Sequence, residues 1–142
     1  MLYVKLLTQT AKTPTAAHSG EDIGYDLYAD ENVNIAPGMM RPVRTGVAIE
    51  FKPKAGAVLK CKSGFALKLD MSIEGGVIDA GYRGEIIALV RNNNHDAFLR
   101  IVQGDKICQM LEYPFVTGLI QVVDELSGAA REERGFGSTG NQ

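Results

Sequence analysis

The chain has 142 residues, the size of one average domain. Apolar residues make up 45% and charged residues 23%, as in ordinary globular proteins, which excludes an intrinsically disordered chain. The net charge of -2 lacks the basic excess of duplex-binding proteins, and the apolar runs fall far below the ~20 residues of a membrane helix, so neither nucleic acid nor a membrane is expected as a partner.

The cysteines and histidines are too few and too widely spaced to predict a zinc site built by the protein. They are Cys61, Cys108, His18 and His95. We expect two buried, reduced thiols, as in a cytoplasmic protein. Lys5 interrupts the apolar stretch that a signal peptide would need, which also favours a cytoplasmic location. Any metal should therefore arrive with a substrate.

Short segments that alternate apolar and polar residues, separated by glycine and proline, predict a protein made mainly of β-strands. In chain order we expect strands at residues 3–7, 33–35, 45–51, 57–61, 85–90, 98–102, 106–111 and 119–123, and at most one short helix, at residues 65–71. The clearest strand is residues 45–51, where Val47, Ile49 and Phe51 share one face. The spacing of about eight to twelve residues favours an all-β, jelly-roll-like barrel or sandwich.

The composition changes near the C-terminus. From residue 127 onward small and charged residues dominate, Gly135, Gly137 and Gly140 lie close together, and Phe136 is the only large apolar side chain. We therefore expect one β domain at residues 1–126 and a mobile C-terminal arm at residues 127–142.

Four short segments place a polar group beside glycines, which lets a backbone approach a ligand closely and frees its N–H groups to bind anions. They are residues 24–27, 62–64, 75–85 and 135–140. Taken singly, each has an ordinary explanation, such as a turn, a solvated loop or a flexible tail. Each segment alone therefore leaves its role open.

In their order along the chain, these segments resemble the motifs of the homotrimeric deoxyuridine triphosphatase (dUTPase) family, from about residue 20 to residue 140. The first motif is Gly-Tyr-Asp-Leu-Tyr-Ala at residues 24–29, and the second is Lys-Ser-Gly at residues 62–64. The third covers residues 76–85, the fourth residues 104–109 and the fifth residues 131–140. The resemblance implies an enzyme, a Mg²⁺-dependent dUTP diphosphatase that yields dUMP and pyrophosphate, limits uracil in DNA and supplies dUMP for thymidylate synthesis.

Three motifs depart from the family pattern. Lys62 replaces an arginine, which keeps the charge but loses the bidentate grip on phosphate oxygens. Gly81 replaces the second acid of the third motif and leaves Asp79 as the candidate base. Glu132 and Arg134 replace two glycines where the arm begins.

The resemblance assigns roles to individual residues. Asp79 is expected to orient and deprotonate the water that attacks the α-phosphorus. Mg²⁺ is expected to arrive on the triphosphate without a direct protein ligand, and Asp26 to act on it through water. The implied substrate-binding residues are Lys62, Ser63, Gly64 and Gln109 for the phosphates, Ile73, Gly76, Val77 and Ile78 for uracil, Tyr82 for deoxyribose, and Arg131, Phe136, Gly137, Ser138 and Thr139 in the arm.

Specificity and closure follow from the same resemblance. Main-chain groups of a hairpin at residues 73–79 would read uracil, and Tyr82 would leave no room for a ribose 2′-hydroxyl. Phe136 would stack on the base while the arm closes over the triphosphate. The family also implies a homotrimer with shared active sites. Two alternatives remain open: an enzyme related to dCTP deaminases, and a dUTPase-like regulatory binding module.

Overall fold

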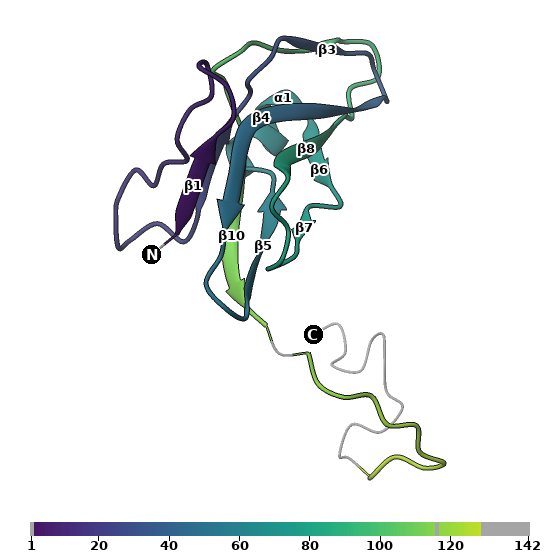
Figure 1. The fold of residues 1–142 in the computed structure, drawn as a ribbon. Helices are drawn as coiled ribbons and strands as arrows, with labels where there is room; N and C mark the ends of the chain where they lie inside the picture. The colour runs from purple at the N-terminus through teal and green to yellow at the C-terminus, as the bar shows by residue number, and fades with distance from the viewer. Residues whose placement is uncertain (1, 116, 129–142) are drawn as a thin grey trace.

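The computed structural model describes residues 2–115 and 117–128, which contain short strands and one short helix (Figure 1). In chain order the elements are β1 (Tyr3–Leu6), β2 (Tyr25–Tyr28), β3 (Val33–Ile35), β4 (Met40–Glu50), β5 (Ala55–Lys60), α1 (Ser63–Leu69), β6 (Met71–Glu74), β7 (Val77–Ile78), β8 (Glu85–Asn92), β9 (Leu99–Ile101) and β10 (Lys106–Pro114). Across these ranges, no helix has the length and apolar character needed to cross a membrane.

Two four-stranded sheets make up most of the fold. The first has the strand order β1-β4-β8-β6 and the second β2-β10-β5-β7, while β3 and β9 pair in a small third sheet. All of these pairings are antiparallel. The all-β sandwich expected from the sequence is confirmed, and the strands of the described ranges do not close into a barrel.

One hydrophobic core joins the two large sheets. Alternate residues of β8 point into it, and Ile86, Ala88 and Val90 are completely buried, as the period of two along a strand requires. Leu59 of β5 and Met110 of β10 meet them from the second sheet and are equally inaccessible. This packing fixes the strand ends, from which the loops that carry polar residues emerge.

Both cysteines are free thiols. Cys61 is partly buried and Cys108 completely buried. Burial raises the pKa of the Cys61 thiol and raises that of Cys108 to about 12. The two side chains therefore stay protonated at neutral pH and act as small apolar groups.

Seven of the eight predicted strands are present, with ends shifted by a few residues. The prediction at residues 119–123 is wrong, because this segment has no strand conformation and Leu119 and Ile120 are exposed. An alternating pattern becomes a strand only where a neighbour supplies ladder hydrogen bonds. The helix begins two residues earlier than predicted, at Ser63, and ends before Asp70, whose φ of 46° is left-handed.

The hairpin predicted at residues 73–79 is a connection between the two sheets. β6 pairs with β8 in the first sheet, whereas β7 pairs with β5 in the second. The chain crosses over at Gly75 and Gly76, whose φ angles of 61° and 84° strain any other residue. The Leu59 N–H donates to the Gly76 carbonyl at 2.8 Å, so the crossing is fixed near the C-terminal end of β5.

The last strand, β10, ends at Pro114. Residues 117–128 continue away from the sheets without regular structure (Figure 1), and their large apolar side chains are mostly exposed. Residues 129–142 lie outside the described residues. The predicted domain boundary at residue 126 and the mobile arm therefore stay predictions.

Candidate active site

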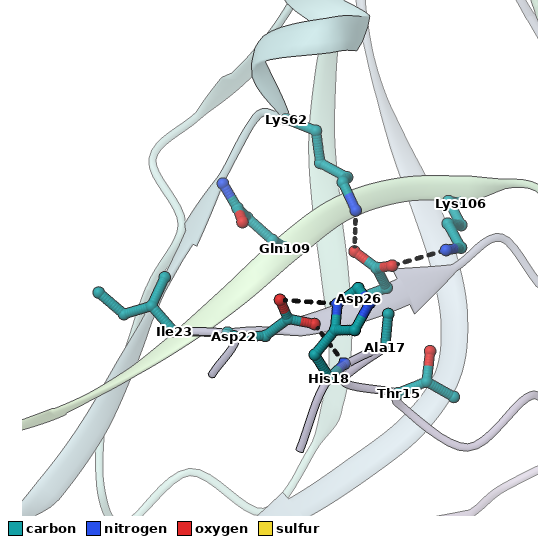
Figure 2. Close-up of a pocket in the computed structure, with 10 residues that line it drawn as sticks. Thr15, Ala17, His18, Asp22, Ile23, Asp26, Lys62, Lys106 and Gln109 are labelled. Carbon is teal, nitrogen blue, oxygen red and sulfur yellow. Dashed lines mark hydrogen bonds and ion pairs between the residues drawn. The ribbon is translucent and has the colours of Figure 1, made fainter. Parts of the chain in front are cut away.

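A pocket lies between the loop at residues 15–24, β2, the turn after β5 and β10 (Figure 2). Three residues that the motifs single out, Asp26, Lys62 and Gln109, line it together. The other lining residues are Thr15, Ala17, His18, Asp22, Ile23, Gly24 and Lys106. The fold thus gathers the first, second and fourth motifs on one concave surface, called here the lysine pocket.

Asp26 is a buried carboxylate held between two ammonium groups (Figure 2). Lys62 Nζ pairs with Asp26 Oδ1, and Lys106 Nζ pairs with Asp26 Oδ2 at 2.8 Å. Burial raises the pKa of Asp26, but the hydrogen bonds and charges of Lys106 and Lys62 outweigh that effect and hold it below its ordinary value. Asp26 is therefore ionised at neutral pH, and the three groups together carry one net positive charge.

The ladder between β2 and β10 positions these groups. Gln109 lies directly opposite Asp26, and the register shifts by one residue between Lys106 and Cys108, which is a β-bulge. Ile107 and Cys108 are consecutive and both buried. Lys106 and Gln109 therefore both line the pocket, although regular alternation would place residues three apart on opposite faces.

Lys106 is the cation of the pocket that the sequence analysis missed. Its signals are its place inside the fourth motif and the consecutive apolar residues Ile107 and Cys108, which do not by themselves identify a bulge. The loop before β2 adds His18 and Asp22 to the lining. The Asp22 carboxylate accepts the His18 main-chain N–H at 2.8 Å, which lowers the pKa of Asp22.

Ser63 and Gly64 begin α1 beside the lysine pocket and are exposed. Lys62 precedes them in an extended conformation, and its carbonyl accepts the N–H groups of Phe65 and Ala66 at 2.9 and 3.0 Å. A Cβ at Gly64 would meet nothing within 4 Å. The second motif therefore borders open space at the start of α1.

A second concave surface carries the third motif and is called here the aspartate surface. Its lining residues are Val77, Ile78, Asp79, Tyr82, Glu85 and Ile87. The Asp79 carbonyl accepts the Tyr82 N–H at 3.0 Å in a tight turn, and the Asp79 side chain is exposed. No residue lines both this surface and the lysine pocket.

The two surfaces lie at opposite ends of β5. Near its start, a Cβ at Gly56 would come within 2.7 Å of the Ile78 carbonyl, which leads directly into Asp79. Lys62 lies six residues beyond Gly56, about 20 Å away at the rise of an extended strand. Within one chain, Asp79 is therefore out of reach of a group bound between Lys62 and Asp26.

The remaining predicted site residues line neither the lysine pocket nor the aspartate surface, or they lie outside the described ranges. Ile73 packs against the core, and Gly76 lies against Leu59. The arm residues outside the described ranges are Arg131, Phe136, Gly137, Ser138 and Thr139.

The Asp26 carboxylate is the group of the lysine pocket whose remaining acceptor positions matter for a metal ion. Within residues 2–115 and 117–128, no three His, Cys, Asp or Glu side chains gather in a metal-binding cluster. Each Asp26 oxygen accepts a hydrogen bond from a lysine, and a carboxylate offers about four acceptor positions. Asp26 can therefore still bind a water molecule of a hydrated Mg²⁺ ion.

Comparisons with known proteins show the family of the chain. A family model described as dUTPase matches residues 9–140. The chain belongs to the dUTPase family. Two curated relatives, the deoxyuridine 5'-triphosphate nucleotidohydrolases of Gloeothece citriformis and Clostridioides difficile, are each 40% identical over 141 residues; the alignments cover 98% of this chain and 96% and 97% of theirs.

Solved dUTPase structures share the fold. A mutant dUTPase of Staphylococcus bacteriophage 80alpha with dUpNHpp gives a TM-score of 0.92 at 28% identity, covering 99% of each chain. A mutant dUTPase of phage phi11, described as revealing the coordination of a structural Mg(II) ion, gives a TM-score of 0.83 at 28% identity over 90% of this chain and 99% of that one. The dUTPase likeness therefore spans the lysine pocket and the aspartate surface.

Proposed function

We propose that the protein hydrolyses dUTP at the α-phosphorus to dUMP and pyrophosphate, which limits uracil in DNA and supplies dUMP for thymidylate synthesis. The dUTPase family match and the curated nucleotidohydrolases at 40% identity support this reaction. The 80alpha dUTPase structure with dUpNHpp supports a deoxyuridine triphosphate as the substrate class. The observation that carries the mechanism is the division of the motif residues between two surfaces of one chain.

A complete site then needs two chains. The lysine pocket of one subunit would face the aspartate surface of another, since the ~20 Å between them along β5 prevents both from acting on one phosphorus within a chain. In a homotrimer with cyclic symmetry, every chain supplies each surface once and three equivalent sites result. We therefore propose a homotrimer with shared active sites.

The lysine pocket would bind the phosphates. Lys62 and Lys106 supply positive charge, and the Gln109 amide supplies a hydrogen-bond donor beside them. The Ser63 hydroxyl and the Gly64 N–H, which follow Lys62 at the start of α1, would add further donors. These groups would hold the triphosphate in one orientation, which is the main requirement for phosphoryl transfer.

A Mg²⁺ ion would enter this pocket on the triphosphate. When bound, it neutralises charge on the phosphate oxygens. Asp26 would hold one of its water molecules, and the two lysines keep Asp26 ionised for that task.

The aspartate surface would supply the base and the specificity. The exposed Asp79 carboxylate would orient a water molecule and accept its proton. The Tyr82 ring would lie beneath the deoxyribose, and main-chain groups of residues 73–79 would read uracil. The arm would complete the site, with Phe136 on the base and the donors of Arg131, Ser138 and Thr139 at the γ-phosphate.

The test is pyrophosphate release from dUTP, dCTP, dTTP and UTP by the pure protein with Mg²⁺. We expect release from dUTP at a rate far above the other three. Ammonia release from dCTP would instead support a deaminase-related enzyme. No turnover of any of the four nucleotides would support a regulatory binding module.

A further inference from the structure

The carboxylate of Glu85 is built into a bulge of the neighbouring strand. Glu85 is the first residue of β8, and the β4–β8 register shifts between Arg44 and Ala48. At this shift the Gly46 N–H donates to Glu85 Oε1 at 2.8 Å, and Arg44 Nε lies 3.0 Å from Glu85 Oε2. Only 15% of the Glu85 side chain is exposed, so β4 holds the start of β8 in place.

The main chain of Glu85 in turn holds Tyr82. The Tyr82 hydroxyl donates to the Glu85 carbonyl at 2.9 Å. The ring also lies against Gly84, where an added Cβ would come within 2.5 Å of the Tyr82 hydroxyl oxygen and 2.6 Å of Cζ. The tip of the ring is therefore fixed by a hydrogen bond, and the place it occupies exists only because residue 84 is glycine.

A second carboxylate reaches the same turn but has a different character. Glu50 Oε1 lies 3.8 Å from Arg83 Nη2, and both side chains are more than half exposed. Exposed ion pairs of this length contribute little. Glu50 is therefore a matched control for Glu85, because both contact the turn that carries Tyr82 and only Glu85 is tied into a strand.

We propose that Glu85 and Gly84 are positioning residues for Tyr82 and set the preference of the site for deoxyribose over ribose. The inference rests on the proposed function, in which the Tyr82 ring packs beneath the sugar. A ring excludes one extra hydroxyl only if it cannot move aside. Glu85 and Gly84 prevent that movement, Glu85 by accepting the Tyr82 hydroxyl and Gly84 by leaving room for the ring.

The test compares kcat/KM for dUTP and UTP in the wild-type protein and in Glu85→Ala, Glu85→Gln, Gly84→Ala, Tyr82→Phe and Glu50→Ala. In Glu85→Ala and Gly84→Ala we expect the dUTP/UTP ratio to fall by at least ~10-fold, since displacements of about 1 Å have effects of this size or more. Tyr82→Phe should lower the ratio as well, because it removes the bond to the Glu85 carbonyl and leaves the β4 bulge intact. Glu85→Gln keeps an acceptor for the Gly46 N–H, so this variant should retain most of the wild-type dUTP/UTP ratio. Glu50→Ala should have the same ratio as the wild-type protein.

The dUTP/UTP ratio separates a positioning role from a loss of stability. A variant that is only less stable loses its activity on dUTP and on UTP by the same factor, so its ratio stays unchanged. Thermal unfolding of each variant gives the folded fraction, and Tyr82→Phe keeps the test decisive if Glu85→Ala does not fold. A wild-type protein that hydrolyses no dUTP would overturn the proposed function, and the same comparison would then be made on the binding of dUpNHpp and its ribose counterpart. A selective wild-type protein whose ratio is unchanged in Gly84→Ala and Tyr82→Phe would overturn this inference alone.

Discussion

The ammonium group of Lys106 lies 2.8 Å from one carboxylate oxygen of Asp26, while Lys62 pairs with the other. These lysines come from β10 and from the turn between β5 and α1, so one buried carboxylate of β2 joins both of them. The same three groups give the pocket its net positive charge. The side chains that stabilise this part of the fold are therefore the ones proposed to bind phosphate.

The ion pairs of Asp26 with Lys62 and Lys106 should make the free energy of unfolding depend on pH. We expect Asp26→Asn to lower the free energy of unfolding at pH 7 by about 1–3 kcal/mol, because charged hydrogen bonds are lost and two lysines are left facing each other. The pKa of Asp26 is lowered in the folded protein. Its contribution is therefore complete above the ordinary aspartate pKa of about 3.9 and is lost as the pH falls through the lowered value.

Urea unfolding of wild-type protein and Asp26→Asn between pH 8 and pH 3 measures this difference. The gap in unfolding free energy should be constant down to about pH 4 and then narrow. Asp96→Asn, at an exposed position, is the control and should show no comparable gap. A gap that grows as the pH falls would contradict the ion-pair interpretation.

Removal of the Lys106 charge should weaken triphosphate binding. We expect Lys106→Met to raise the Kd for dUpNHpp by about tenfold, the equivalent of one charge-assisted hydrogen bond. Lys52→Met changes an exposed lysine in the turn between β4 and β5 and should have no such effect. Calorimetric titration checks both variants, and equal Kd values would remove Lys106 from the phosphate site.

The assignment of Asp79 as the general base predicts that its replacement lowers kcat and leaves nucleotide binding unchanged. Asp79→Asn keeps the shape of the side chain but cannot accept a proton, so kcat should fall by at least ~10²-fold. Binding of dUpNHpp and the unfolding temperature should stay near their wild-type values, since Asp79 is exposed and outside the core. Single-turnover kinetics measure the chemical step, and wild-type turnover by the variant would exclude Asp79 as the base.

Two impaired variants should restore each other if the sites are shared. Asp79→Asn removes the base from one surface, and Lys62→Met removes a phosphate contact from the other, so each variant alone should be much less active than wild type when dUTP is kept below its Kd. After equal amounts are unfolded and refolded together, random assembly of trimers should pair two intact surfaces in about a quarter of the sites. Pyrophosphate release near that fraction of the wild-type rate is expected. A mixture no more active than its components would place the whole site within one chain.

The sequence predicted the lysine pocket in part. Asp26, Lys62 and Gln109 were grouped through the motif resemblance, and the structure brings them together. Lys106 was missed because the bulge at Ile107 depends on how β10 pairs with β2. The consecutive apolar residues Ile107 and Cys108 fit a strand buried on both faces equally well.

Non-local pairing also explains the other errors. Gly75 and Gly76 predict a turn, but whether the flanking segments pair with each other depends on β5 and β8, which lie elsewhere in the chain. The segment at residues 119–123 is rich in apolar and β-branched residues, as a strand is, but no strand of the described ranges pairs with it. Local patterns therefore located most strands but did not assign their partners.

The bulge in β10 determines at which position this strand can tolerate the insertion or deletion of a residue. Ile107 is the extra residue, because one step on β2, from Tyr28 to Leu27, spans two steps on β10, from Lys106 to Cys108. Deleting it would restore regular alternation, leaving Lys106 facing the pocket and Cys108 facing the core, and would remove one buried side chain. A deletion between Cys108 and Pro114 would instead turn every residue on one side of the gap to the opposite face. Natural insertions and deletions in β10 should therefore accumulate at residue 107.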